Sequence, residues 1–226
     1  MRSAAASVAR TYRSSRREAQ ARRTRRRILD AATTLFVARG YAGATMRSIA
    51  TEAGVSVPTL ELGFGTKARL LKAAIDVAIV GDDDAVPVLE RGWTRSALAA
   101  RTAEEFLAVV AAVIGPAQAR SAGLVLAVFE GSSIDGELAQ LSEQMIRQRA
   151  VTARWIVDGM TRTARLRQDL SQEGAVDTVW ILMDPALFDR LTRHREWSLE
   201  QYQVWFARSA LHLLVDDAAP TETRHP

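Results

Sequence analysis

The sequence contains no cysteine, only three histidines and no long uninterrupted apolar run. Without cysteine, there is neither a disulfide framework nor thiolate chemistry. His194, His212 and His225 are too scattered for a convincing metal site, and the first two more commonly cap or pack. The apolar stretches 107–114 and 123–129 are short and are separated by polar residues, so we expect no membrane-spanning segment.

The sequence also lacks a catalytic constellation. Gly131-Ser132-Ser133 has no G-x-S-x-G spacing, and Gly63-Phe64-Gly65 lacks the spacing of a phosphate-binding loop. The triple aspartate at 82–84 lacks the later ligands of a calcium loop, which favours a solvated helix exit. We therefore expect neither an enzyme nor a cofactor.

Positive charge is concentrated at the N-terminus. Residues 1–27 hold ten arginines and a single acid, Glu18, within a chain whose net charge is +4. The body of the chain is therefore mildly acidic. A basic arm of this kind attracts nucleic acid because binding releases counterions, although a solvated tail without a role is the alternative.

Residues 45–67 carry the spacing of a helix-turn-helix. Thr45 and Ser56 are suitable N-caps, Gly54 can end the first helix in a left-handed conformation, and Pro58 is tolerated in a first turn. The pattern predicts helices over 46–53 and 57–63, joined by a short turn, a shape that fits the major groove.

The motif extends on both sides, from ILDAATTLFVARGY at residues 28–41 to Leu71. In one unbroken register, this combination resembles the DNA-binding head of the TetR family of bacterial transcription regulators. A weaker resemblance, to the C-terminal helix pair of TetR-like proteins, covers residues 175–214. The resemblance implies an all-α, homodimeric protein with a DNA-binding head and a helical body for effector binding and dimerisation.

The second helix of the motif departs from the family pattern at two positions. The family usually has an aromatic residue where this chain has Glu61, and often has histidine where it has Gly63. Thr45, Thr59 and Lys67 match phosphate-contacting positions of the family. The DNA-binding residues that we expect are Thr45, Arg47, Ser56, Val57, Pro58, Thr59, Glu61, Leu62, Gly63 and Lys67, together with Arg22, Arg23, Arg25 and Arg26 of the basic segment.

Composition and helical periodicity divide the chain into four parts. We expect a flexible basic arm over 1–22, a helix-turn-helix domain over 23–81, a helical body over 82–217 and a disordered tail over 218–226. Helices outside the motif are expected over 24–39, 67–80, 102–114, 116–131, 136–163, 172–193 and 198–215.

Large apolar side chains in the body are candidates for an effector pocket, although for each residue alone a place in the core is the more common outcome. The candidates are Phe106, Phe129, Met145, Trp155 and Trp180. The helices over 172–193 and 198–215 have apolar surfaces that a second copy would cover. The interface that we expect there involves Val179, Met183, Leu187, Trp205, Leu211 and Leu214.

The sequence therefore predicts a cytoplasmic DNA-binding transcription regulator, most simply a repressor that a small apolar or amphipathic molecule releases from its operator. The alternative is a dimeric ligand-binding protein whose head no longer reads DNA, which Glu61 and Gly63 suggest.

Overall fold

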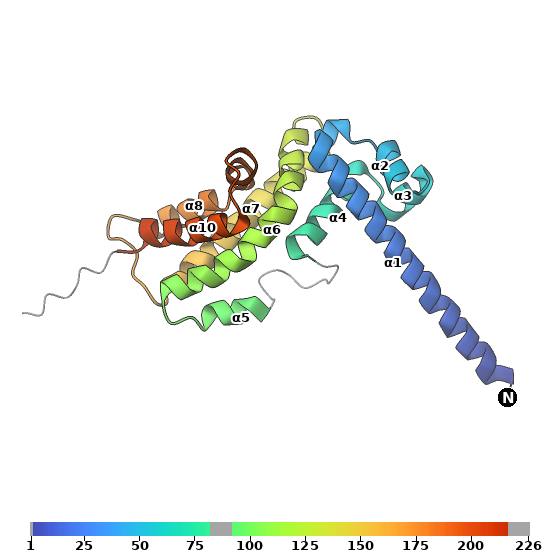
Figure 1. The fold of residues 1–226 in the computed structure, drawn as a ribbon, viewed down its shortest axis with the longest axis horizontal. Coiled ribbons are helices and arrows are strands. Elements are labelled where there is room, and N and C mark those ends of the chain that lie inside the picture. Colours follow the sequence, from blue (N-terminus) through green and yellow to red (C-terminus); the bar gives the residue numbers. More distant parts are fainter. Residues whose placement is uncertain (1, 82–91, 217–226) are drawn as a thin grey trace, which may run out of the picture.

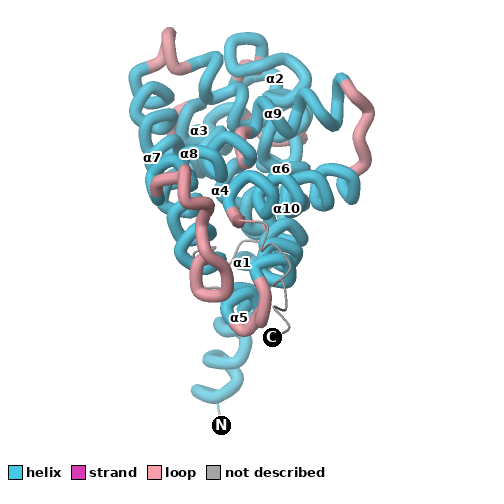
Figure 2. Tube along the Cα trace, turned by 90° about the vertical axis from the view of Figure 1, so that its left-hand side faces the viewer, coloured by secondary structure: helices cyan, strands magenta, loops and turns pink. Residues whose placement is uncertain are grey.

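The computed structural model describes residues 2–81 and 92–216, with side chains from residue 17 onward, and its regular structure is helical (Figures 1 and 2). The expected disordered tail and the aspartates at 82–84 lie outside the described residues. The elements are α1 (Arg2–Gly43), α2 (Met46–Glu52), α3 (Val57–Phe64), α4 (Lys67–Val80), α5 (Gly92–Leu98), α6 (Ala103–Gly131), α7 (Gly136–Met160), α8 (Gln172–Leu182), α9 (Pro185–Asp189), the π-helical turn η2 (Arg190–His194) and α10 (Leu199–Leu214).

The head, residues 23–81, shares its core with the body. Phe36 of α1, Ile49 of α2, Leu60 of α3 and Leu71 of α4 are almost completely buried together. The same cluster includes four residues from the C-terminal half of α6 and Leu138 of α7. The boundary expected near residue 81 is therefore not a boundary in packing.

The first helix is much longer than the sequence suggested. We expected a flexible arm and a helix that begins near Thr24, but α1 begins at Arg2 and its N-terminal half projects away from the rest of the chain (Figure 1). No proline or glycine interrupts residues 2–39, and alanine and arginine both favour helix. Gly40, where we expected the helix to stop, does break its regular geometry, with φ of 65° and ψ of −179°.

The long helix α6 corrects the expectation of two helices separated at Gly115-Pro116. Pro116 lies inside a helix of 29 residues, although it cannot donate its backbone hydrogen bond. Packing keeps the helix continuous, because a Cβ at position 115 would approach Gln203 Cγ of α10 to 2.7 Å. The Gln203 amide also donates to the Ala111 carbonyl, one residue from the carbonyl that Pro116 leaves without its helical donor.

The single helix expected over 172–193 is also incorrect, because α8 ends at Leu182 and α9 begins at Pro185. Asp184 caps α9 by accepting from the Ala186 amide at 2.8 Å. The end of α8 is buried, and its carbonyls still find donors: Tyr202 donates to Leu182 and Gln118 donates to Met183.

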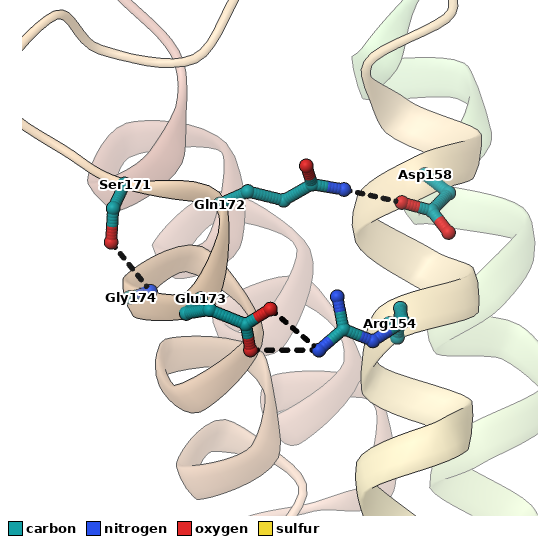
Figure 3. Close-up of polar contacts among 6 residues, drawn as sticks. All are labelled: Arg154, Asp158, Ser171, Gln172, Glu173 and Gly174. Atoms are coloured by element: carbon teal, nitrogen blue, oxygen red, sulfur yellow. Dashed lines mark hydrogen bonds and ion pairs between the residues drawn. The ribbon is translucent and has the colours of Figure 1, made fainter.

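The start of α8 is held against α7 by exposed polar contacts (Figure 3). A guanidinium nitrogen of Arg154 lies 2.9 and 2.7 Å from the two carboxylate oxygens of Glu173. The Gln172 amide donates to Asp158, and the Ser171 hydroxyl accepts from the Gly174 amide as the N-cap. The Arg154 and Gln172 contacts thus link the first turn of α8 to α7.

Candidate nucleic-acid interface

The helix-turn-helix is built by local capping, as the sequence predicted. The Thr45 hydroxyl accepts from the Ser48 amide, and Ser48 in turn accepts from the Thr45 amide, which makes a capping box. Ser56 caps α3 through the Thr59 amide, and Gly54 takes a positive φ of 62° in the turn. Pro58 lies in the first turn of α3.

Helix α3 has one buried face and one exposed face. Leu60 is completely buried against the head core, and Val57 and Phe64 pack partly against it. On the opposite side, the Leu62 side chain is 90% exposed. The remaining predicted contact residues on α3, namely Pro58, Thr59, Glu61 and Gly63, are also exposed. The α3 side chains that we expect to contact DNA are therefore available to a partner.

The predicted basic residues lie on the surface near α3. Arg22, Arg23, Arg25 and Arg26 are exposed on α1, and Arg47 is exposed on α2. The Arg25 guanidinium lies 4.8 Å from the centroid of the Phe64 ring, a cation–π contact at the end of α3. This contact places the C-terminal part of the arginine-rich segment beside α3.

Lys67 has a structural role that the sequence analysis missed. Its ammonium donates to the carbonyls of Tyr41 at 2.8 Å and Ala44 at 3.1 Å, and it lies 3.9 Å from the centroid of the Tyr41 ring. Desolvation lowers the pKa of this lysine. Two of its three donors thus hold the end of α1, which leaves one donor for the phosphate that we expected it to contact.

A polar junction joins the head to the start of α7. The Tyr41 hydroxyl donates to Asp135 at 2.5 Å, and the Thr66 hydroxyl donates to Glu137 at 2.6 Å. Burial and the hydrogen bond to Asp135 raise the pKa of Tyr41. The same hydrogen bond lowers the pKa of Asp135. The sequence analysis did not predict the contact between Tyr41 and Asp135, because residues 94 positions apart give no local signal of contact.

The far end of α4 is held by α6. Arg120 donates through Nε to the Ala78 carbonyl at 2.7 Å and through Nη2 to the Ile79 carbonyl at 3.2 Å. These carbonyls belong to the last turn of α4, where a cation is favourable because helix carbonyls there lack partners. Gly81 then ends the helix with φ of 86°. Helix α4 is therefore held by the body at both ends.

The five predicted effector residues are divided between the two cores. Phe106 and Trp155 have ring centroids 5.7 Å apart in the body core, and Trp180 lies there beneath the Arg149 guanidinium. Phe129 and Met145 pack instead against the head core. The five residues are divided in this way because α6 and α7 are long enough to pass through both cores.

A surface groove of about 300 Å³ lies between α6 and α10. Alanines of α6 together with Val204 and Leu211 of α10 give it apolar walls, and Glu104 and Arg208 are charged residues in its lining. A smaller pocket of about 100 Å³ is lined in part by Phe106 and Gly159. Neither pocket was indicated by the sequence, because each depends on how neighbouring helices pack.

The predicted dimer residues fall into two groups. Val179 and Leu214 are completely buried within the chain and Met183 is 7% exposed, so these three have almost no surface for a second copy. They belong to the body core, which is a correction to the expected interface. The other three, Leu187, Trp205 and Leu211, are partly exposed.

Two further features concern metal binding and membrane insertion. Among the described residues, no group of three or more His, Asp or Glu side chains is arranged to hold a metal ion. Helix α6 is long and apolar enough to cross a membrane by length and composition alone. Its apolar side chains, however, form parts of both the head core and the body core.

The head region of the chain is similar to a known protein family. Residues 28–74 match the family model of bacterial regulatory proteins, tetR family. A search of curated proteins found no match.

Solved structures with the same fold cover most of the chain. A protein from Rhodococcus sp. described as a TetR-family transcriptional regulator is 17% identical, with 86% of this chain and 99% of that chain covered and a TM-score of 0.61. The regulator FadR from Bacillus subtilis in complex with stearoyl-CoA is 21% identical, with coverages of 84% and 97% and a TM-score of 0.62. A transcriptional regulator from Saccharomonospora viridis in complex with choline is 20% identical, with coverages of 85% and 97% and a TM-score of 0.61. Residues 28–74 therefore resemble the TetR family model, and the chain as a whole has the fold of TetR-family regulators.

Proposed function

We propose that the protein is a homodimeric DNA-binding transcription repressor, released from its operator by a small apolar or amphipathic effector, and that it acts in the cytoplasm without catalytic chemistry. The observation that carries this proposal is the exposed face of α3. Leu60 anchors the helix in the head core while Leu62, two residues later, is 90% exposed. A capped two-turn helix presented in this way fits the major groove.

The arginine-rich part of α1 supports DNA binding through phosphate contacts. Arg22, Arg23 and Arg26 are exposed, and Arg25 contacts the end of α3. Contacts of this kind position a protein on the duplex but do not specify sequence. We propose that the helical arm supplies much of the affinity, whereas α3 supplies the choice of sequence.

We propose that α4 transmits the effector signal. It connects Arg120 of α6 at its last turn to Glu137 of α7 at Thr66, the cap of its first turn. A shift of α6 or α7 would therefore move the head. Two heads must lie about 34 Å apart to enter successive major grooves, so an effector that favours another spacing weakens operator binding by its differential affinity for the two states.

The effector itself is proposed to be apolar or amphipathic. The groove between α6 and α10, with apolar walls and the charged residues Glu104 and Arg208, fits such a molecule. One of its walls is α6, the helix that also carries Arg120. Neighbours with the same fold hold stearoyl-CoA or choline, which are amphipathic or charged small molecules. A thermal-shift screen of such compounds, repeated with Ala112→Trp to fill the groove, tests this assignment: stabilisation of both proteins alike would place the ligand elsewhere.

The second candidate is a dimeric ligand-binding protein without operator recognition, which the composition of α3 favours. Glu61 is an exposed acid on the reader helix, and Gly63 contributes no side chain. Capture of genomic fragments by the full-length protein at moderate salt, followed by sequencing, separates the two. Enrichment of a defined palindromic site supports the repressor, and uniform recovery or no recovery supports the alternative.

A further inference from the structure

The outward face of α3, formed by Pro58, Thr59 and Leu62, is largely apolar. These residues are spaced by three and four positions and so share one side of the helix, opposite the buried Leu60. Leu62 lies between the other two on this face and is 90% exposed. A molecule that docks on α3 from outside therefore meets the Leu62 methyl groups first.

The polar side chains of α3 offer little for reading bases. The helix has no arginine, lysine, asparagine or glutamine, which are the residues that bond guanine or adenine in a bidentate manner. The Thr59 hydroxyl is 2.8 Å from the Ser56 hydroxyl, and the Ser56 oxygen also accepts from the Thr59 amide. Glu61 can only accept when it is ionised, and an added Cβ at Gly63 would meet nothing within 4 Å.

The apolar side chains of this face favour one chemical group on the DNA. The C5-methyl of thymine is the apolar feature that a base edge presents in the major groove, and apolar side chains contact it. We propose that Leu62 determines the sequence specificity of the head by packing against thymine methyl groups in the operator half-site. This inference rests on the proposed DNA-binding function and adds to it the base that is recognised.

The experiment begins with the full-length protein and a library of duplexes of randomised sequence. The recovered duplex is then synthesised again with deoxyuridine in place of single thymidines, a change that removes one methyl group and keeps the base pairing. At one or two positions in each half-site, the wild type should lose about fourfold in affinity, the value of one buried methylene. The Leu62→Ala protein should bind the thymidine and deoxyuridine duplexes equally.

A matched control is Val151→Ala, which removes an exposed apolar side chain from α7, where the residue is 62% exposed. This protein should retain the preference of the wild type for thymidine. Two results would overturn the assignment of Leu62 and leave the DNA-binding function standing. The wild type could bind a defined duplex with the same affinity after deoxyuridine replaces thymidine, or the Leu62→Ala protein could still lose affinity on the deoxyuridine duplex. Recovery of no duplex at all would overturn both.

Discussion

Replacing Tyr41 by phenylalanine tests the junction between the head and the body, because it removes a single hydroxyl. The ring remains, and with it the packing near Phe36 and the contact with the Lys67 ammonium, which lies 3.9 Å from the ring centroid. What is lost is the hydrogen bond to Asp135. The variant therefore separates this bond from the packing around it.

The expected loss follows from the surroundings of Asp135. A hydrogen bond to a charged group contributes roughly 1.5–3 kcal/mol. Asp135 is only partly buried and keeps its bonds from the Glu137 and Leu138 amides, so water can replace the missing donor in part. We expect the Tyr41→Phe protein to lose about 1–2 kcal/mol of unfolding free energy at pH 7.

The pKa shifts determine how this loss depends on pH. The hydrogen bond from Tyr41 lowers the pKa of Asp135 in the folded protein, so its contribution is present above the unfolded value of about 3.9 and disappears as pH falls through the folded value. Burial raises the pKa of Tyr41, so its contribution is present below the unfolded value of about 10 and is lost as pH rises further. The difference between the two proteins should therefore be constant across the neutral range and shrink in acid.

Urea unfolding at equal protein concentration, at pH 7 and at about pH 3, measures this difference. The control is Arg154→Ala, which removes an exposed partner of Glu173 and should change stability little at either pH. An unchanged midpoint for Tyr41→Phe at pH 7 would refute the proposed strength of the junction. An equal loss at both pH values would show that the ring environment, and not the ionised Asp135, is responsible.

Three further outcomes follow from the structure. Ile181→Arg, at a residue that is 52% exposed on α8, should give monomers in sedimentation velocity, whereas Ile146→Arg on α7 should not; dimers of both would exclude α8 from the interface. Gly159→Ala should lower the unfolding free energy by about 1–3 kcal/mol, because its Cβ would lie 2.3 Å from Phe106 Cζ; an unchanged thermal midpoint would contradict this. Deleting residues 1–22 removes six arginines and should reduce the slope of log K against log salt by at most about 5 per protomer. An unchanged slope would show that this segment does not contact DNA phosphates.

The head could be predicted closely because its signals are local. Thr45 and Ser56 act as caps through amides three residues away, and Gly81 ends α4 in the left-handed conformation. Such interactions depend on a few adjacent residues and are therefore visible in the sequence. The arginine-rich segment was misjudged for a related reason: a segment polar on all sides resembles a solvated arm, yet it can extend a helix that is nucleated elsewhere.

The two prolines of the body show where local signals fail. Pro116 is accommodated inside α6, where Gly115 is pressed against Gln203 of α10. Pro185 ends the regular helix, since Asp184 can cap a new one and Gln118 supplies a donor to the buried end of α8. The same residue type has opposite outcomes because the deciding partners are distant in sequence. Neither outcome follows from the flanking residues alone, because Gln203 and Gln118 are distant in sequence from the prolines.

The apolar stripe of α10 presents the same ambiguity on a larger scale. A helical stripe shows that a face is covered, but it does not show by what. Tyr202, Phe206 and Leu214 of this stripe are completely buried within the chain, so they are not available to contact a second copy. An interface through the last helices must therefore use the flanks that remain, including Trp205 and the exposed Ile181. Arginine at position 214 would consequently report on folding, and only changes on those flanks would report on assembly.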